Sequence, residues 1–420
     1  MSEPRIKAPR GTYDVLPEQA PARALLEGRA RAILEGAGYE RIETPAFEAT
    51  ELFARGVGES TDIVQKEMYT FLDGSGRSLT LRPEGTAPIC RAYIEHGMHK
   101  LAAPVKLWYL SSFFRYERAQ SGRYREFWQV GAEALGSDDP AVDAESILLL
   151  SSLLAELGVA GVRLRLSSLG DRESRGEYRE RLRSHLHAHA SELSAEVRER
   201  IDANPLRAFD SQHEGTRAVM AEAPRLLDHL SAADAEHFAS VRELLDAVGV
   251  RYEVDATLVR GLDYYTRTVF EFTSDALGAQ SGVGGGGRYD GLVELLGGPP
   301  TPAMGWAAGI ERMLLAAGEE LRQAAPSRVD LFVAIQGSAS RTQAFELLRD
   351  ARSAGLAAQM ELAGRSLKRQ LAHADRLGAR YVAILDAGQA GLKDMESGRQ
   401  ETMDADSVVH ALLRGLREIA

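Results

Sequence analysis

The spacing of apolar residues changes along the chain, and these changes predict where helices and strands begin and end. Apolar residues at helical spacing predict a first helix that ends near Glu35, where two glycines stop it, and a short strand that Pro45 closes. Residues 66–83 contain two short β runs around Asp73-Gly74, which is the signature of a hairpin. This part of the chain is therefore expected to mix helices with short antiparallel strands.

A second and longer hairpin is predicted from the β runs at residues 105–117 and 125–136, which a polar loop connects. Side chains alternate faces along a strand, so one face of the second run carries Arg125, Phe127, Gln129, Gly131 and Glu133. The opposite face is mostly apolar and is expected to join the core. The first face is expected to be polar and open, either as the solvated side of an antiparallel sheet or as the floor of a ligand site.

The pattern becomes helical after the second hairpin. Residues 141–159 have the apolar spacing of a helix, and residues of about 172–250 have a composition that predicts a helical insertion. β character resumes over residues 251–274, and a Gly-rich turn is expected at residues 282–291. A short apolar segment then leads into a helix that contains Arg312.

Strands and helices alternate regularly in the last part of the chain, after a linker expected at Ala324–Arg328. The segments that alternate are residues 329–335, 341–355, 356–362, 366–378 and 379–386. Such alternation predicts a small α/β domain. We therefore expect one domain over residues 1–325, with the helical insertion inside it, and a second domain over residues 327–420.

Composition and charge narrow the possible functions. The 420 residues carry a net charge of −11, so a polyanion would have to meet a local patch on this acidic chain. Residues from Ser327 onward hold 13 Lys and Arg against 12 Asp and Glu, which makes the last domain the better candidate for that contact. Cys90 is the only cysteine, which excludes an internal disulfide and a Cys-rich zinc site. With neither a signal peptide nor a bilayer-spanning apolar run, the protein is expected to be cytoplasmic and free of membrane.

Polar groups and glycines gather at a predicted strand-to-helix turn, residues 82–86. Pro83 fixes one backbone dihedral there, and Gly85 permits close approach of another group. Glu84 and Thr86 either cap the helix or present a carboxylate and a hydroxyl group to a ligand ammonium group.

Two further stretches combine a cation with aromatic residues or glycines. Arg260 stands before Tyr264 and Tyr265 at a strand entry, which suits either a planar anionic ligand or a buried structural pair of tyrosines. The glycines before Tyr289 would let a strand lie flat against a ligand, with Tyr289 closing over it. Arg312 alone is compatible with an ordinary exposed arginine on a helix.

Several kinds of site are not supported by the spacing of residues. Gly282, Gly284 and Gly287 match the spacing of the dinucleotide fingerprint, but no βαβ unit surrounds them and the expected acidic residue is missing. A P-loop and a serine nucleophile elbow are also missing from the sequence. His185 and His189 share a helix face without an evident third ligand, so no metal held by the protein alone is expected.

Taken together and in this order, the motifs resemble those of the histidyl-tRNA synthetases, a family of class II aminoacyl-tRNA synthetases. Residues 38–48 are similar to the first class II motif, residues 114–133 to the second and residues 303–312 to the third. Residues 260–272 and 284–292 resemble the two histidine-specific signatures. The resemblance extends over nearly the whole chain.

The resemblance implies an α+β fold, with a class II catalytic domain built on an antiparallel sheet, a helical insertion and a C-terminal α/β anticodon-binding domain. It implies ATP-dependent ligation of L-histidine to tRNA(His) through a histidyl-adenylate, with release of AMP and diphosphate. Mg²⁺ is expected to arrive with ATP. The first motif implies a homodimer.

The resemblance also implies a role for single residues. Those implied at the histidine are Glu84, Gly85, Thr86, Arg115, Gln129, Glu133, Arg260, Tyr264, Tyr265 and Tyr289. Glu84, Thr86 and Gln129 would bind the α-ammonium group. Glu133 and Tyr265 would recognise the imidazole, in a pocket that the other two tyrosines line.

A second set of residues is implied at ATP, namely Arg115, Glu117, Arg123 and Arg312. Arg115 would hold the α-phosphate and the histidine carboxylate, and Glu117 would face the adenine. Arg123 would bind the outer phosphates, and Arg312 would pair with the γ-phosphate. Arg115 and Arg260 are the implied catalytic residues, with Arg260 partly in the place of a metal ion.

Two other classes of protein share part of this pattern. The regulatory subunit of ATP phosphoribosyltransferase has the same catalytic fold, but it generally lacks the C-terminal domain and the motif arginines that this chain retains. A generic RNA-binding module would bind tRNA without turning over ATP. Histidine-dependent exchange of pyrophosphate into ATP separates both from a synthetase.

Overall fold

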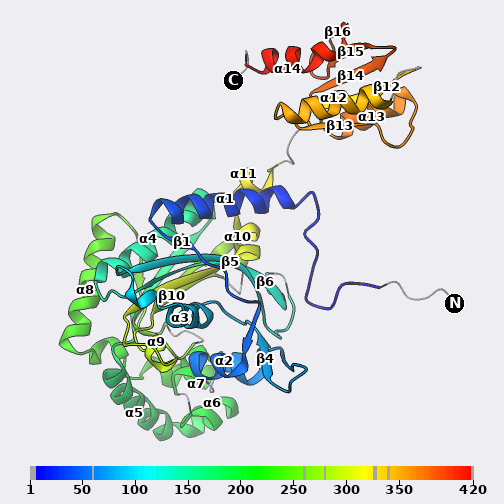
Figure 1. Ribbon diagram of the computed structural model, residues 1–420. Coiled ribbons are helices and arrows are strands. Elements are labelled where there is room, and N and C mark those ends of the chain that lie inside the picture. The colour runs from blue at the N-terminus through cyan, green and yellow to red at the C-terminus, as the bar shows by residue number, and fades with distance from the viewer. Residues whose placement is uncertain are drawn as a thin grey trace, which may run out of the picture. The chain divides into compact units, whose positions relative to one another are not determined.

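The computed structural model describes residues 6–58, 61–120, 122–203, 205–258, 262–278, 281–324, 329–337 and 341–417. The chain divides into two compact units, Met1–Ala324 and Ala325–Ala420, and each is described by itself. Figure 1 shows the elements of each unit along the chain.

An eight-stranded sheet forms the centre of the first unit (Figure 1), with the strand order β1-β5-β6-β11-β10-β9-β7-β8. In that order the strands are Glu40–Arg41, Val105–Phe114, Glu126–Leu135, Ala303–Gly309, Gly282–Arg288, Thr266–Ser274, Val162–Ser168 and Glu253–Val254. The pairs at the two edges, β1–β5 and β7–β8, are parallel, and every pair between them is antiparallel. The predicted second hairpin is confirmed as β5–β6, in which Phe113 pairs with Phe127.

The two faces of this sheet belong to two apolar clusters. One face packs against α1 (Ala20–Gly36), α4 (Pro140–Glu156), α8 (Ala232–Ala247) and α10 (Ile310–Ala316). The other face packs against α3 (Thr86–Glu95) and α9 (Leu292–Leu295). Alternation along β5 sends Trp108 into the first cluster and Leu107 and Tyr109 into the second, as a strand between two layers requires.

A small sheet with the order β2-β4-β3 stands beside the central one. Its strands are Phe47–Ala49, Ser78–Leu81 and Thr70–Leu72, and the β3–β4 pair is the hairpin predicted around Asp73-Gly74. The helix α2 (Thr50–Val57) and a π-helical turn, Ile63–Glu67, connect it to the rest of the unit. The short helix α11 (Glu319–Arg322) ends the unit.

Every element that the structure describes between β7 and β8 is helical. The α-helices there are α5 (Arg172–Ala188), α6 (Ala195–Arg200), α7 (Glu214–Ala221) and α8. Helices α5 to α7 build an apolar cluster of their own, whereas α8 buries Phe238, Val241 and Leu245 against α4 and the central sheet. The last helix of this segment therefore belongs to the core of the sheet.

The turn expected at residues 282–291 is wrong for most of its length, because Gly282–Arg288 is the strand β10 in the middle of the sheet. Glycine is required here by close approach of the neighbouring backbone. A Cβ atom on Gly286 would lie 2.0 Å from the carbonyl oxygen of Gly305 in β11. A local propensity for turns is overridden by the pairing of two strands.

The second unit is an α/β layer structure, as the alternating pattern predicted. Its five-stranded sheet has the order β13-β12-β14-β15-β16, with strands Ala358–Met360, Leu331–Ile335, Tyr381–Asp386, Gln389–Asp394 and Gln400–Asp404. The first three strands in this order are parallel, and the last two pair antiparallel. The helices are α12 (Arg341–Ser353), α13 (Leu367–Arg376) and α14 (Val408–Arg417).

Candidate active site

Two adjoining cavities open on the face of the central sheet that carries α3. The inner cavity has a volume of about 340 Å³ and the outer one a volume of about 690 Å³. The residues that line both are Arg115, Arg123, Gln129, Glu271, Gly285 and Ala307. A ligand could therefore extend from one cavity into the other past two guanidinium groups and a carboxylate.

The floor of the inner cavity comes from the predicted polar face of β6, but this face is not open along its whole length. Gln129 lines both cavities, whereas Glu133 is 1% exposed. Tyr109 of β5 is paired with Gly131 and stands over it, and a Cβ atom on Gly131 would lie 2.3 Å from the Tyr109 ring. The space that the glycine leaves is thus filled by a tyrosine, and the expected open face is limited to its Gln129 end.

Glu133 lies behind the lining of the inner cavity and accepts short hydrogen bonds from two residues that line it, Thr86 and Tyr289. The Thr86 hydroxyl group donates to Oε1 at 2.7 Å, and the Tyr289 hydroxyl group donates to Oε2 at 2.6 Å. A Cβ atom on Gly305 would lie 1.6 Å from Oε2, so the carboxyl group fits only because β11 has a glycine there. Burial raises the pKa of Glu133 to about 8, although both hydrogen bonds act in the opposite direction.

Glu84 caps the helix α3, which is one of the two roles predicted for it from the sequence. Its carboxylate accepts from the backbone N–H groups of Thr86 at 2.8 Å and Ala87 at 3.0 Å. Both the carboxylate and Gly85 nevertheless line the inner cavity, with the Tyr109 ring directly over the glycine. Burial raises the pKa of Glu84, and the two backbone groups oppose that rise.

Three tyrosines, Tyr264, Tyr265 and Tyr289, line the inner cavity. The Tyr264 ring lies 4.8 Å from that of Tyr265 and 5.7 Å from that of Tyr289, measured between ring centroids. Tyr264 also donates a long hydrogen bond, 3.4 Å, to Glu84. Tyr289 lines the cavity and donates to Glu133, and its closing over a ligand stays a prediction.

The helical segment fixes the backbone that carries these tyrosines. Arg175 of α5 donates to the carbonyl oxygen of Tyr265 at 2.7 Å. Arg267, two residues further on, has a φ of 44°, a left-handed conformation that is uncommon for a residue other than glycine. An ion pair of 2.9 Å with Asp234 of α8 holds it in place. Here β9 shifts register against β10, which turns the tyrosines toward the cavity.

Arg260 and Gly261, which precede these tyrosines, lie outside the described residues. Arg260 therefore stays a prediction.

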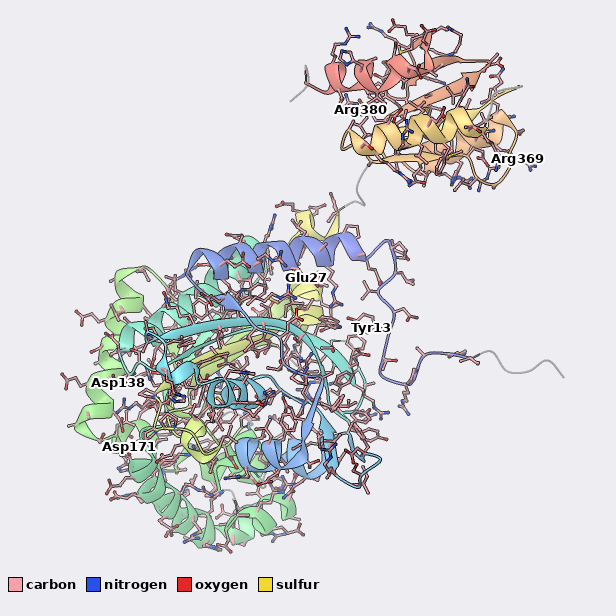
Figure 2. All side chains as sticks on the ribbon, viewed as in Figure 1. Tyr13, Glu27, Asp138, Asp171, Arg369 and Arg380 are labelled. Carbon is pink, nitrogen blue, oxygen red and sulfur yellow. The ribbon has the colours of Figure 1, made fainter. Side chains whose placement is uncertain are left out.

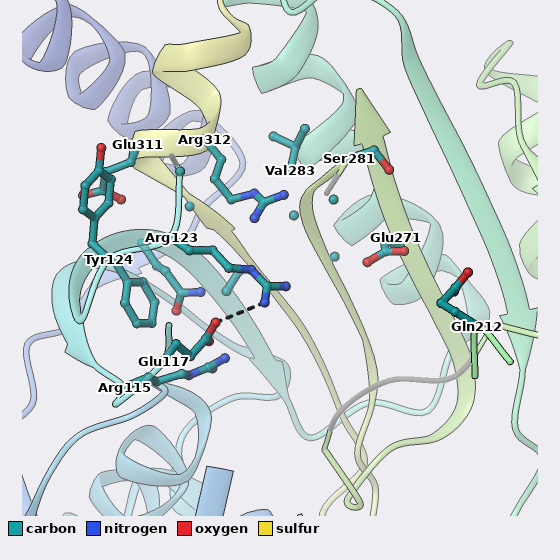
Figure 3. Close-up of a pocket in the computed structure, with 18 residues that line it drawn as sticks. Arg115, Glu117, Arg123, Tyr124, Gln212, Glu271, Ser281, Val283, Glu311 and Arg312 are labelled. Atoms are coloured by element: carbon teal, nitrogen blue, oxygen red, sulfur yellow. Dashed lines mark hydrogen bonds and ion pairs between the residues drawn. The ribbon is translucent and has the colours of Figure 1, made fainter. Parts of the chain in front are cut away.

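Three arginines line the outer cavity and supply its positive charge. Arg115 donates from Nε to the carbonyl oxygen of Pro83 at 2.8 Å, which leaves the far end of its guanidinium group toward the cavity. Figure 3 shows Arg123 and Arg312 entering the hollow from the loop before β6 and from α10, with Glu271 across from them. Burial lowers the pKa of Arg312, and the charge of Arg123 lowers it further. Like charges held together in this way favour an anionic ligand.

Carboxylates accompany these arginines. Glu117 pairs with Arg123 at 3.1 Å (Figure 3), an interaction at the surface that an incoming anion could replace. Glu271 of β9 is held by Arg165 at 3.3 Å and lines both cavities. Sequence reasoning gave no role to Glu271, although it lies inside a stretch that was singled out.

Tyr109 was missed as well, because its place opposite a glycine of β6 depends on the register of two strands. Gly305, which lies in the third motif, makes room for the Glu133 carboxyl group. The basic residue Arg82 belongs to the framework, since it donates to the carbonyl oxygens of Ser112 and Thr44.

Among the residues that the structure describes, no group of three His, Cys, Asp or Glu side chains is arranged to hold a metal ion. Within the same residues, no helix is both long and apolar enough to cross a membrane.

The fold is that of a class II aminoacyl-tRNA synthetase, and comparison with known proteins makes the assignment specific. Residues 11–313 match the family model described as histidyl-tRNA synthetase, and residues 330–414 match the anticodon binding domain. The histidine–tRNA ligase of Thermosynechococcus vestitus is 49% identical over 92% of this chain and 90% of its own length. The chain belongs to the histidyl-tRNA synthetase family.

Solved structures agree with this assignment. The apo histidyl-tRNA synthetase of S. aureus is 35% identical, with a TM-score of 0.81 over 97% of this chain and all of that one. A Bacillus halodurans protein described as an ATP phosphoribosyltransferase regulatory subunit/histidyl-tRNA synthetase is 24% identical, with a TM-score of 0.65 over 92% of this chain and all of its own. At that identity the second likeness shows the fold alone.

The raised pKa of Glu133 predicts a stability effect that depends on pH. The pKa rises from 4.5 to about 8 on folding, so the favourable contribution of the protonated group is present below about pH 4.5 and is lost as the pH rises through about 8. Glu133→Gln cannot ionise, so its stability relative to the wild type should increase over this range, by up to about 1.4 kcal/mol per pH unit.

Urea unfolding of both proteins between about pH 5 and about pH 8 measures this difference. Tryptophan fluorescence reports on the first unit, because Trp108, Trp128 and Trp306 are the only tryptophans in the sequence. Parallel pH profiles for the two proteins would show that Glu133 titrates normally.

Proposed function

We propose that this chain catalyses the ATP-dependent ligation of L-histidine to tRNA(His). The observation that carries the proposal is the adjoining pair of cavities, one with a buried carboxyl group among hydroxyl groups and one with three guanidinium groups. The first suits a small ligand with a cationic or N–H-bearing ring, and the second suits a triphosphate. Arg115 and Gln129 line both, so the two ligands would meet beside them.

Histidine would occupy the inner cavity. Its imidazole N–H would donate to Glu133 in the company of Tyr265, with Tyr264 and Tyr289 around the ring. Its α-ammonium group would face Glu84, Thr86 and Gln129, above Gly85. A site of this kind rejects other amino acids strongly, because they would leave buried polar groups without partners, so editing is not needed.

ATP would occupy the outer cavity, and its α-phosphate would lie near Arg115. Arg123 and Arg312 would hold the outer phosphates, and Glu117 would face the adenine. Arg115 and Arg260 would act as the catalytic residues by neutralising the charge that develops at the α-phosphate, Arg260 from outside the described residues.

The chemistry requires positioning more than proton transfer. The histidine carboxylate is itself the nucleophile: one of its oxygens forms a bond to the α-phosphorus while the bond to the leaving diphosphate breaks. No general base is needed for this step, which fits a site rich in arginine. In the second step a ribose hydroxyl group at the end of tRNA(His) attacks the histidyl carbonyl carbon, and AMP leaves.

Mg²⁺ is the ion expected to accompany ATP. It usually keeps several water molecules and binds through one or two carboxylates together with phosphate oxygens. Glu271 fits this role, because it is a carboxylate that faces the outer cavity across from two arginines (Figure 3). The ion would reduce repulsion between the phosphates and the histidine carboxylate.

The same proposal extends to the domains and the location of the protein. We assign residues 1–325 to the catalytic domain, with a helical insertion over about 172–250, and residues 327–420 to the domain that binds the anticodon. A cytoplasmic enzyme is expected from the use of ATP and tRNA as substrates. A regulatory subunit of ATP phosphoribosyltransferase is disfavoured, because Arg115, Arg123 and Arg312 would have no use in it.

A homodimer is also proposed, through the small sheet next to the first class II motif. Phe47, Phe71 and Leu72 of this sheet are 50%, 43% and 69% exposed, and the two phenylalanine rings lie 6.2 Å apart. An apolar group of this kind is typical of a surface that another chain covers.

The exchange of labelled pyrophosphate into ATP tests the proposed activity when each amino acid is supplied in turn. Exchange should depend on histidine alone. Gly305→Ala should raise the KM for histidine by about a hundredfold or more, because the new methyl group displaces Glu133.

Gly309→Ala is the matched control, because Gly309 lies in the same strand as Gly305. Its new Cβ atom would lie 3.5 Å from the Arg312 side chain, an ordinary van der Waals distance. Its KM for histidine should stay near that of the wild type. Exchange that is absent with every amino acid, from a folded protein, would refute the synthetase proposal.

Removal of residues 325–420 should separate the two steps of the reaction. Exchange should stay within about threefold of the full chain, whereas aminoacylation should fall by about a hundredfold as contacts to the tRNA are lost. Steady-state assays of both steps on both chains measure this. Equal losses in the two assays would mean that the second unit supports the catalytic fold and not the tRNA.

Charge placed on the small sheet should dissociate the proposed dimer. Leu72→Glu should lower the mass measured by sedimentation equilibrium from that of two chains to that of one, because a charge buried without a partner is strongly unfavourable. Phe345→Glu, at a 64% exposed residue of α12, is the control and should keep the wild-type mass. A wild-type protein that sediments as one chain would rule out the dimer.

A further inference from the structure

The segment Pro9–Tyr13, called the N-terminal strap below, runs along the loop that carries Arg123. The backbone N–H of Arg125 donates to the carbonyl oxygen of Gly11 at 2.7 Å. The guanidinium group of Arg125 donates to the carbonyl oxygen of Arg10 at 3.4 Å. Gly11 has a φ of +89°, and a Cβ atom there would lie 2.7 Å from Cγ of Arg125. The strap therefore lies against this arginine at a distance that only glycine allows.

The end of the strap reaches α10. The Tyr13 hydroxyl group donates to Oε1 of Glu311 at 2.7 Å, and its ring centroid lies 4.5 Å from that of Tyr124. Both oxygens of Glu311 accept from the backbone N–H of Trp128, at 3.0 and 3.1 Å. Figure 2 marks Tyr13 on the segment that leads into α1, and Figure 3 shows Tyr124 beside Glu311 at the edge of the outer cavity.

Arg125 has its polar contacts within the protein. Its Nε donates to the carbonyl oxygen of Glu117 at 3.3 Å, and its guanidinium group stacks over Tyr116 at 3.9 Å from the ring centroid. Arg125 thus connects the N-terminal strap to the residues that follow β5 and to the start of β6.

The elements joined in this way carry two arginines of the outer cavity. Arg123 lies two residues before Arg125, and Arg312 directly follows Glu311. Glu311 is 6% exposed, and its carboxylate has partners from the strap and from β6. Displacement of the strap would loosen the loop and the first turn of α10 at the same time.

We propose that Gly11, Tyr13, Arg125 and Glu311 are positioning residues, which set the place of Arg123 relative to Arg312 before the nucleotide binds. This inference rests on the proposed function, since the ligand of the two arginines is the triphosphate of ATP. The strap does not touch the inner cavity, so its effect falls on ATP and spares histidine.

Tyr13→Phe tests the proposal, because it removes one hydroxyl group and keeps the ring on Tyr124. The KM for ATP in pyrophosphate exchange should rise by about three- to tenfold, as for loss of a typical hydrogen bond. The KM for histidine should not change. Gly11→Ala should have a larger effect of the same kind, because it pushes the strap away from Arg125.

Thr12→Val is the matched control within the strap. Within the described part of the chain, the Thr12 hydroxyl group bonds to the carbonyl oxygen of Pro9, at the surface, so this variant should keep the wild-type KM for ATP. An equal rise in both KM values for Tyr13→Phe, or no rise in the KM for ATP, would overturn the proposal. If Gly11→Ala does not fold, Tyr13→Phe alone still tests the proposal.

A double-mutant cycle distinguishes positioning from a general loss of stability. In an Arg312→Lys background, Tyr13→Phe should raise the KM for ATP by less than it does in the wild type, because the group that it positions is already altered. Additive effects would contradict a role through Arg312.

Calorimetric titration with ATP and Mg²⁺ gives the same comparison without turnover. A wild-type protein that binds ATP but exchanges with no amino acid would refute the proposed function, and a weaker affinity for ATP in Tyr13→Phe would still support the strap.

Discussion

The arrangement of the site depends on one buried carboxyl group in the middle of the sheet. Removing a carboxylate from water costs several kcal/mol, and a hydroxyl partner returns about 1–3 kcal/mol when the acceptor is charged. Glu133 has two such partners, yet burial still raises its pKa to about 8, so desolvation is the larger effect. At neutral pH this burial therefore favours the protonated acid. Under the proposed function, a ligand that brings an N–H group or a positive charge would restore the ionised form, and selectivity for a basic ring would follow from that balance.

This requirement extends to residues that carry no charge. Gly305 is needed because any side chain on β11 would occupy the position of the Glu133 oxygen. Gly286 of β10 is also needed, because a Cβ atom there would lie 2.0 Å from the carbonyl oxygen of Gly305. Thr86 begins α3, so the turn before that helix is fixed by the same carboxyl group behind the cavity lining. Under the proposed function, a change at any of these positions would act on the ligand through Glu133.

The sequence allowed much of this to be predicted, where the signal is local. Alternation along β6 correctly separated Gln129 and Glu133 from the core side, and regular alternation of strands and helices identified the α/β unit at the end of the chain. The predictions were wrong where contacts between residues far apart in the sequence determine the local structure. The glycines of β10 suggested both a turn and a flat strand, because a neighbouring strand that approaches so closely leaves no local signature, and the structure shows the strand. The open face expected on β6 is filled by Tyr109 and Tyr289, which pairing and a long connection bring to it. The role of Tyr13 depends on Glu311, almost the whole first unit away in sequence.

The arginines of the outer cavity show why the fold alone does not define the activity. A protein of the same fold could keep the sheet and the inner cavity and have no reason to hold Arg123 and Arg312 near each other, since each lowers the stability of the other's charge. The Arg123–Glu117 pair is partly exposed, with 45% and 20% of the two side chains accessible, and such pairs contribute little to stability. Exchanging Glu117 for a phosphate therefore costs little. Burial of Arg312 costs more than Glu271 and Glu117 offset, and an anion that arrives in the cavity would reduce this cost further. Positive charge is thus concentrated in an acidic chain at the place where a triphosphate would remove the penalty.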